Sequence, residues 1–222
     1  MLYDVIGPVM IGPSSSHTAG MVKLGRAFHY IFNGKIEEVC FYLNEQLFST
    51  YKGHGSDRAL LGGIMGINES DESLIYSIDM AKDKGIKYRF ICTNFPGKHP
   101  NTVKIVGKNK NKTLSMEGCS IGGSSVIIKM IQNQKVNIVG IFPSLIIKNR
   151  DVPGALASIL YILRKNDVNI SNLSLIRSDK IKKTAICVIE LDNKPSSAVI
   201  ECIKKLKNVL EISFMPKLEV NL

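Results

Sequence analysis

The sequence predicts an α/β (α+β) protein in two parts: a mixed α/β N-terminal domain over residues 1–140 and a ferredoxin-like βαββαβ domain over residues 141–222. Two patterns predict this division. Amphipathic helical segments alternate with short strand patterns in the first part, whereas the second part has the order β-α-β-β-α-β within roughly 80 residues. The chain has 222 residues, 45% of them hydrophobic, which is enough to bury a core in each domain.

The first domain is expected to begin with a helix over residues 17–32. Its apolar residues recur at helical spacing, and Asn33-Gly34 is a helix stop signal. A second helix follows with Ser56 or Asp57 as its N-cap, and a third spans residues 72–84. Strand patterns occur at residues 39–43, 86–92, 101–107, 113–118 and 124–131, with the third and fourth joined by the turn GKNKNK.

The second domain has strand patterns at residues 144–149, 169–178, 183–192 and 209–215, and helical patterns at residues 151–168 and 195–208. It resembles an ACT domain in Asp151, Pro153, Gly154, Leu156 and Asn169-Ile170. Asp151 can cap the helix, Pro153 suits its first turn, and Gly154 permits close approach of a ligand or a second backbone. The resemblance implies a regulatory module that pairs side by side and binds amino acids where the copies meet. A purely structural dimerisation unit is the alternative.

The net charge of +10 makes nucleic acid a partner to consider. However, the lysines are spread through turns, and the chain has no tryptophan and no basic stretch interleaved with aromatic residues. We therefore predict solvated basic faces and no nucleic-acid partner. No apolar run approaches the ~20 residues that span a bilayer, and the N-terminus lacks the pattern of a signal peptide. No membrane association and a cytoplasmic location are expected.

The five cysteines are scattered at Cys40, Cys92, Cys119, Cys187 and Cys202. None lies in a C-x-x-C pair or with a histidine at metal-ligand spacing. An odd number of scattered cysteines is typical of reduced thiols in a cytosolic protein. The sequence therefore predicts no metal ligands and no iron–sulfur motif in this chain.

The stretch IGPSSSHTAG places three serines and a histidine at the start of the first helix. The first N–H groups of a helix lack intrahelical partners, and the helix dipole is positive there. The hydroxyls of Ser14, Ser15 and Ser16 add donors that suit a phosphate or a carboxylate, and His17 can move a proton. Plain N-capping is the alternative, but it accounts for one serine better than for three.

The stretch GHGSD repeats this arrangement, because glycines flank His54 just before Ser56 at a second helix start. If both helix starts face one pocket, they form an anion site with two acid–base groups. The stretch HPNT at residues 99–102 and the loop GCSIGGSS at residues 118–125 are further candidates to line it. The loop lacks dinucleotide-site spacing and a P-loop lysine, and Cys119 within it is expected to be a buried thiol.

Together these motifs resemble the beta subunit of the iron–sulfur-dependent L-serine dehydratases, or L-serine ammonia-lyases. The matching stretches are GPSSSHTAG, KGHGSD, HPNTV, SIGG and the ACT-like tail, with Ser56 where the family often has threonine. In this family an alpha part carries the cysteines of a [4Fe-4S] cluster, and a beta part carries the serine–histidine motif. The resemblance therefore implies a partner alpha subunit that ligates the [4Fe-4S] cluster.

The implied reaction eliminates water from L-serine and yields pyruvate and ammonia, with the cluster as Lewis acid and a base that takes the α-proton. The implied site comprises His17 and His54 as acid–base or orienting groups, Ser14, Ser15 and Ser16 as carboxylate ligands, and Ser56, His99, Asn101 and Thr102 as further substrate contacts. Which histidine is acid or base stays open. The alternative function is a non-catalytic amino-acid-sensing regulatory subunit.

Overall fold

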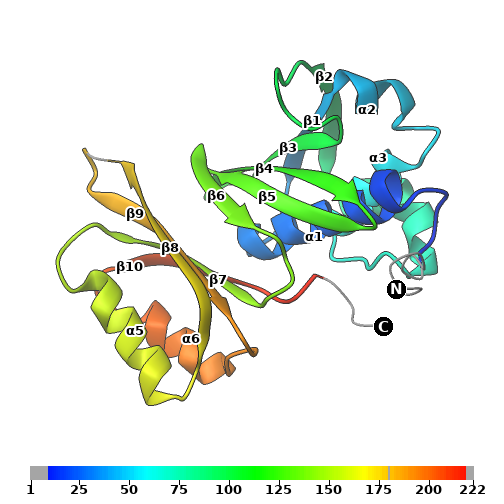
Figure 1. Cartoon of the computed structure of the whole chain (residues 1–222). Helices are drawn as coiled ribbons and strands as arrows, with labels where there is room; N and C mark the ends of the chain where they lie inside the picture. Colours follow the sequence, from blue (N-terminus) through cyan, green and yellow to red (C-terminus); the bar gives the residue numbers. More distant parts are fainter. Residues whose placement is uncertain (1–9, 180, 219–222) are drawn as a thin grey trace. The chain divides into compact units, whose positions relative to one another are not determined.

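The computed structural model describes residues 10–179 and 181–218, and contacts divide the chain into two compact units (Figure 1). The first unit runs to Asn133 and the second continues from Gly140, with the short segment between them shared. Each unit combines strands with helices, which confirms the mixed α/β class. Among the described residues, none of the helices has the length and apolar composition required to cross a membrane.

Six strands of the described chain form a mixed sheet with the order β2-β1-β3-β4-β5-β6. They are β1 (Glu38–Asn44), β2 (Lys87–Thr93), β3 (Thr102–Lys108), β4 (Thr113–Gly122), β5 (Ser125–Ile131) and β6 (Gln134–Ile138). β1 and β2 are parallel, whereas β1–β3, β3–β4 and β4–β5 are antiparallel. The turn GKNKNK joins β3 to β4 as predicted, because Lys108 pairs with Thr113.

The helical elements of the first unit are the π-helical turn η2 (Ser15–Ala19), α1 (Gly20–Phe32), α2 (Glu45–Thr50), α3 (Ser56–Ile64), the 3-10 helix η3 (Glu72–Tyr76) and α4 (Ser77–Asp83). α1 packs against β4, β5 and α3, so nearly all of its residues are buried. It ends at Asn33, whose left-handed φ of 46° stops the helix as expected.

The crossing of α1 and α3 depends on two glycines. A Cβ atom on Gly63 would lie 2.3 Å from the Val22 carbonyl oxygen, and one on Gly25 would lie 2.7 Å from that of Leu60. The two backbones are therefore in direct contact, which a larger residue at either position prevents. This close crossing lets the start of α3 reach the start of α1, where the candidate histidines lie.

We expect Gly63→Ala to lower the free energy of unfolding of the first unit by about 1–3 kcal/mol, the usual cost of overpacking a core. The added Cβ meets main-chain atoms of α1, which cannot rotate away as the tip of a side chain can. Thermal unfolding of the full chain measures the effect. Gly34→Ala is the matched control, because a Cβ there has no neighbour closer than 3.9 Å. Equal melting temperatures for the two variants would contradict the tight crossing.

Two expectations for the first unit need correction, and two short elements were not expected. Neither Ser56 nor Asp57 caps α3, because Gly55 occupies the N-cap in the left-handed conformation and the Ser56 hydroxyl bonds to His17 instead. The helix expected over residues 72–84 is divided into η3 and α4. α2 and β6 were not predicted, since six and five residues are too short to show a periodic pattern.

The second unit has the predicted order, which confirms the ferredoxin-like βαββαβ arrangement. Its elements are β7 (Ser144–Arg150), α5 (Ala155–Lys165), β8 (Ile170–Asp179), β9 (Thr184–Leu191), α6 (Ser197–Lys204) and β10 (Val209–Met215). In the described residues these strands form an antiparallel sheet with the order β10-β7-β9-β8. Both helices bury their apolar faces in one core shared with the sheet, and Figure 1 shows them on the same side of it.

Asp151 does not cap α5, contrary to the sequence expectation. Gly154 is the N-cap residue with a φ of 82°, and Asp151 Oδ2 instead pairs with Arg177 Nε at 2.8 Å. Glycine favours this left-handed turn, and a Cβ on Gly154 would have no other atom within 4 Å. The loop before α5 is therefore open enough for a ligand or a second chain to approach.

Candidate functional site

The serine stretch forms a widened turn at the start of α1. Ser14 is extended, its Oγ accepts a hydrogen bond from the His17 N–H at 3.1 Å, and its carbonyl oxygen accepts one from the Ala19 N–H at 3.3 Å. The second bond makes the turn π-helical, a form often found at functional sites. Upstream, the Ile11 N–H donates to the Glu69 carbonyl oxygen at 2.8 Å and anchors the stretch.

The starts of α1 and α3 are joined by two hydrogen bonds that run in opposite directions. Ser56 Oγ donates to the His17 carbonyl oxygen at 2.6 Å, and Thr18 Oγ1 donates to the His54 carbonyl oxygen at 2.9 Å. Both hydroxyl-bearing residues are buried, so water competes little for these bonds. As a result, the imidazole rings of His17 and His54 lie side by side with their centroids 4.8 Å apart and their planes 54° apart.

Asn101, in the loop before β3, joins this pair. Its Oδ1 lies 3.0 Å from His17 Nε2. Because an amide oxygen can only accept, Nε2 carries the proton and Nδ1 keeps its lone pair. His54 is held the other way round, since its Nδ1 lies 3.2 Å from the Thr50 carbonyl oxygen. In the neutral form of each ring, the nitrogen left to accept a proton is Nδ1 of His17 and Nε2 of His54.

The other two candidates of the HPNT stretch shape the turn that presents Asn101. Thr102 is buried, and its Oγ1 donates to the His99 carbonyl oxygen at 2.6 Å. The Asn101 N–H donates to His99 Nδ1 at 3.1 Å, while the rest of the His99 side chain is exposed. The hydroxyl of Thr102 is thus used within the turn, and His99 Nε2 is left on the outside.

The three serines are all half-buried, but their surroundings differ. Ser14 Oγ caps the turn through the His17 N–H and lies 3.4 Å from Ser16 Oγ. Ser15 contributes its carbonyl oxygen, which accepts from the N–H of Gly20. Capping therefore accounts for the Ser14 hydroxyl but not for those of Ser15 and Ser16, which keeps an anion-binding role available to them.

A small pocket with a volume of about 150 Å³ opens beside His54. Its lining includes Gly12, Thr18, Lys52, His54, Arg58 and Ile75, but not His17 or the three candidate serines. Lys52 and Arg58 give the pocket a positive charge, which suits a carboxylate. Neither cation is among the site residues expected from the sequence, although both lie within a few residues of His54 in KGHGSDR.

Known proteins carry the same two parts. A family model described as the serine dehydratase beta chain matches residues 5–84, and a model of the ACT domain matches residues 144–208. A protein of Bacillus subtilis (strain 168) named probable L-serine dehydratase, beta chain, is 32% identical over 212 residues, which cover 96% of each chain. The chain belongs to the family of L-serine dehydratase beta chains.

Two further relatives extend this comparison. The L-serine dehydratase, beta chain, of Peptoniphilus asaccharolyticus is 33% identical to this beta chain over 192 residues, or 86% of each. A protein of Helicobacter pylori (strain J99 / ATCC 700824) named L-serine dehydratase is 33% identical over 138 residues, which are 52% of the beta chain and 30% of that protein. The beta-chain family model over residues 5–84 includes His17 and His54, whereas Asn101 lies beyond it.

The two buried thiols of the beta chain are not poised as metal ligands. Burial raises the pKa of the Cys119 thiol, although Lys129 acts in the opposite direction, and burial raises the pKa of Cys187 to about 12. Both therefore stay protonated near neutral pH. Within residues 10–179 and 181–218, no three His, Cys, Asp or Glu side chains gather into a metal-binding group. This donor set does not fit a [4Fe-4S] cluster, which is held by several thiolates.

Proposed function

We propose that this beta chain is one subunit of a [4Fe-4S]-dependent L-serine ammonia-lyase that converts L-serine to pyruvate and ammonia. The observation that supports the proposal most directly is the pair of imidazoles, His17 and His54, beside a cationic pocket. Elimination of water from serine needs a group that removes the α-proton and a site that holds the carboxylate. The first unit offers candidates for both where two helix starts meet.

In this proposal His17 is the base. Its Nδ1 lone pair accepts the α-proton, and Asn101 Oδ1 accepts from Nε2–H and stabilises the imidazolium that forms. His54, whose ring centroid lies 4.8 Å from that of His17, is proposed to orient the substrate, with its Nδ1 held by the Thr50 carbonyl oxygen.

The carboxylate of the substrate is proposed to bind in the pocket beside His54, where Lys52 and Arg58 supply positive charge. Ser15 and Ser16 do not line this pocket and are proposed as further donors from the adjoining turn. We expect Arg58→Met to raise KM for L-serine about tenfold with little change in kcat, since loss of one charge-assisted bond costs about 1.5 kcal/mol. Steady-state kinetics on the assembled enzyme measure this. Arg89→Met, at an exposed position on β2, is the control. An unchanged KM for Arg58→Met would remove that residue from the carboxylate site.

We place the [4Fe-4S] cluster on a separate alpha subunit, since the described residues hold no group of three or more His, Cys, Asp or Glu side chains that could bind a metal. When bound, such a cluster supplies an electrophile for the substrate hydroxyl. The relatives named as beta chains match this chain over nearly their full length, which supports a division of the enzyme between chains. This chain then contributes the base, the carboxylate site and the orientation of both.

The test is pyruvate release from L-serine by the complex captured anaerobically from the native host on a tagged copy of this chain. The expected result is pyruvate formation together with a co-purifying, iron-rich second chain. Capture of this chain alone, with serine bound but no pyruvate formed, would support the amino-acid-sensing subunit instead. A tagged chain that carries four irons by itself would contradict the placement of the cluster.

We also propose that the ACT unit self-associates and binds an amino-acid effector. β8 is an edge strand of its sheet, and Leu175 on it is 42% exposed. An exposed edge strand can pair with a second copy. Leu175→Lys should therefore reduce the oligomer in sedimentation velocity, whereas Leu210→Lys, equally exposed on the opposite edge strand, should not. An equal fraction of oligomer in the two variants would contradict pairing through β8.

Titration of the full chain with L-serine in a calorimeter tests whether an amino-acid effector binds.

A further inference from the structure

We propose that the ion pair between Lys98 and Glu117 is a positioning clasp, which holds the loop at residues 94–101 so that Asn101 fixes the tautomer of His17. The effect of this clasp on the reaction rate rests on the proposed function. Its effect on the tautomer of His17 is independent of the proposed function.

The loop at residues 94–101 connects two strands that lie on opposite sides of β1. It leaves β2, which lies on one side of β1, and enters β3, which lies on the other side. It must therefore pass the end of β1 without the hydrogen-bonded ladder of a strand or the turns of a helix. A loop of this kind holds a side chain to a fraction of an ångström only if separate contacts anchor it.

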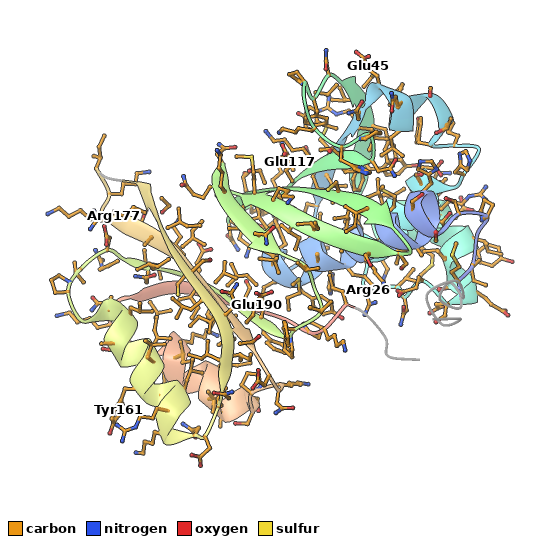
Figure 2. All side chains as sticks on the ribbon, viewed as in Figure 1. Arg26, Glu45, Glu117, Tyr161, Arg177 and Glu190 are labelled. Atoms are coloured by element: carbon orange, nitrogen blue, oxygen red, sulfur yellow. The ribbon has the colours of Figure 1, made fainter. Side chains whose placement is uncertain are left out.

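The first anchor is the clasp itself. Lys98 Nζ lies 2.6 Å from Glu117 Oε1 and 2.8 Å from Oε2, so it contacts both oxygens of the carboxylate. Glu117 projects from β4 (Figure 2), and its side chain is only 9% exposed, whereas that of Lys98 is 40% exposed. Phe95 of the same loop is buried, and the Lys98 ammonium lies 5.2 Å from its ring centroid.

A buried ion pair usually adds little to the stability of a sheet compared with an apolar side chain in the same place. An apolar residue of similar volume usually stabilises a protein as well as a buried ion pair does, because the pair first loses its hydration. What an ion pair adds is a single preferred geometry, since Lys98 must meet Glu117 or leave a nearly buried charge without its partner. This is the property that a loop carrying a functional side chain requires.

The second anchor lies three residues further along both segments. The Ser120 N–H of β4 donates to the Asn101 carbonyl oxygen at 3.3 Å, just as Lys98 contacts Glu117 of β4. Around Asn101, the Thr102 N–H donates to the His99 carbonyl oxygen at 3.0 Å and closes the turn. The position of Lys98 is therefore transmitted to Asn101 through a short, hydrogen-bonded segment.

At the end of this chain of contacts, Asn101 Oδ1 accepts from His17 Nε2 and leaves Nδ1 as the basic nitrogen. Lys98 and Glu117 do not reach the imidazole themselves, so they are positioning residues. If the clasp opens, only the second anchor still holds Asn101, and we expect its side chain to leave His17 in part of the molecules. A neutral imidazole then distributes its proton between the two nitrogens. A fraction of the protein then has the wrong nitrogen protonated, and small displacements of this kind are costly in rate.

The test uses the full chain and the variants Lys98→Met and Glu117→Gln, with Lys98→Arg as the conservative variant. Lys108→Met is the matched control, since it breaks a similar ion pair, that with Glu38 at 2.8 Å, in the same sheet. Two-bond proton–nitrogen NMR spectra of the imidazoles report the tautomer, and His17→Gln assigns the signal. We expect Nε2–H in the wild type, in Lys98→Arg and in Lys108→Met, and a mixture of tautomers in Lys98→Met and Glu117→Gln.

In the assembled enzyme, Lys98→Met and Glu117→Gln should lower kcat about tenfold and leave KM unchanged. This loss is smaller than the one that a displacement of a full ångström causes. A folded Lys98→Met chain that keeps the Nε2–H tautomer and the wild-type kcat would overturn the clasp. Tautomer mixing in these variants, together with a wild-type complex that makes no pyruvate, would support the clasp and overturn the proposed function. The two failures are therefore distinguishable.

Discussion

Replacing His17 with glutamine is expected to lower kcat for pyruvate formation by on the order of 10²–10⁴-fold, the usual contribution of a general base. Glutamine can still meet Asn101 through its amide but cannot accept a proton near neutral pH. The backbone contact from Ser56 to residue 17 is kept, so the two helix starts should stay joined. Pre-steady-state measurement of α-proton loss from deuterated L-serine, in the complex with the partner chain, separates this step from product release.

His29→Gln is the control for this prediction. His29 lies in the last turn of α1, where its Nδ1 contacts the Ile64 carbonyl oxygen at 3.0 Å. Its replacement should affect stability slightly and the rate of α-proton loss not at all. If His17→Gln turns over L-serine at the wild-type rate, His17 is not the base, and His54 becomes the candidate for that role.

Glu69→Gln is expected to lower the free energy of opening of the first unit by about 3–5 kcal/mol, the usual cost of removing one partner from a buried ion pair. Glu69 Oε2 lies 3.2 Å from Arg26 Nη1, and Oε1 lies 3.9 Å from Lys23 Nζ. The three side chains are between 4% and 11% exposed, so water cannot replace the lost carboxylate. Native-state hydrogen exchange of the α1 amides measures the opening of this unit separately from the second one.

Glu38→Gln supplies the matched comparison for Glu69→Gln. Its carboxylate also pairs with a cation, Lys108, but the two side chains are 38% and 55% exposed. Solvent screens such a pair, and its loss should change the exchange of α1 amides hardly at all. An equally small effect of both variants would show that water reaches the Lys23–Arg26–Glu69 group.

The local features of the site could be predicted from the sequence because each depends on neighbours along the chain. The apolar spacing over residues 17–32 predicts α1, and Asn33 predicts its end, since a helix is a local structure that terminal residues stop. The serines and His17 could be placed at a helix start for the same reason. The βαββαβ order of the tail could be predicted because each helix and strand is long enough to show its hydrophobic periodicity.

The N-cap of α3 and the two cations of the pocket could not be predicted from the sequence. Gly55 caps α3 in place of a serine because the Ser56 hydroxyl bonds to a residue 39 positions away, and no local rule contains that partner. Lys52 and Arg58 look like solvated charges in the sequence. Only the folded loop shows that they line the pocket beside His54.

The sequence by itself determined which chemical groups this protein carries and on which kind of element each one sits. The tertiary structure alone decided that His17, His54 and Asn101 meet, that Asn101 Oδ1 faces His17 Nε2, and that Lys98 pairs with Glu117. The physical reason is distance along the chain. His17 and Asn101 are 84 residues apart, and only the glycine crossing of α1 with α3 and the strand order of the sheet bring such residues within hydrogen-bond reach.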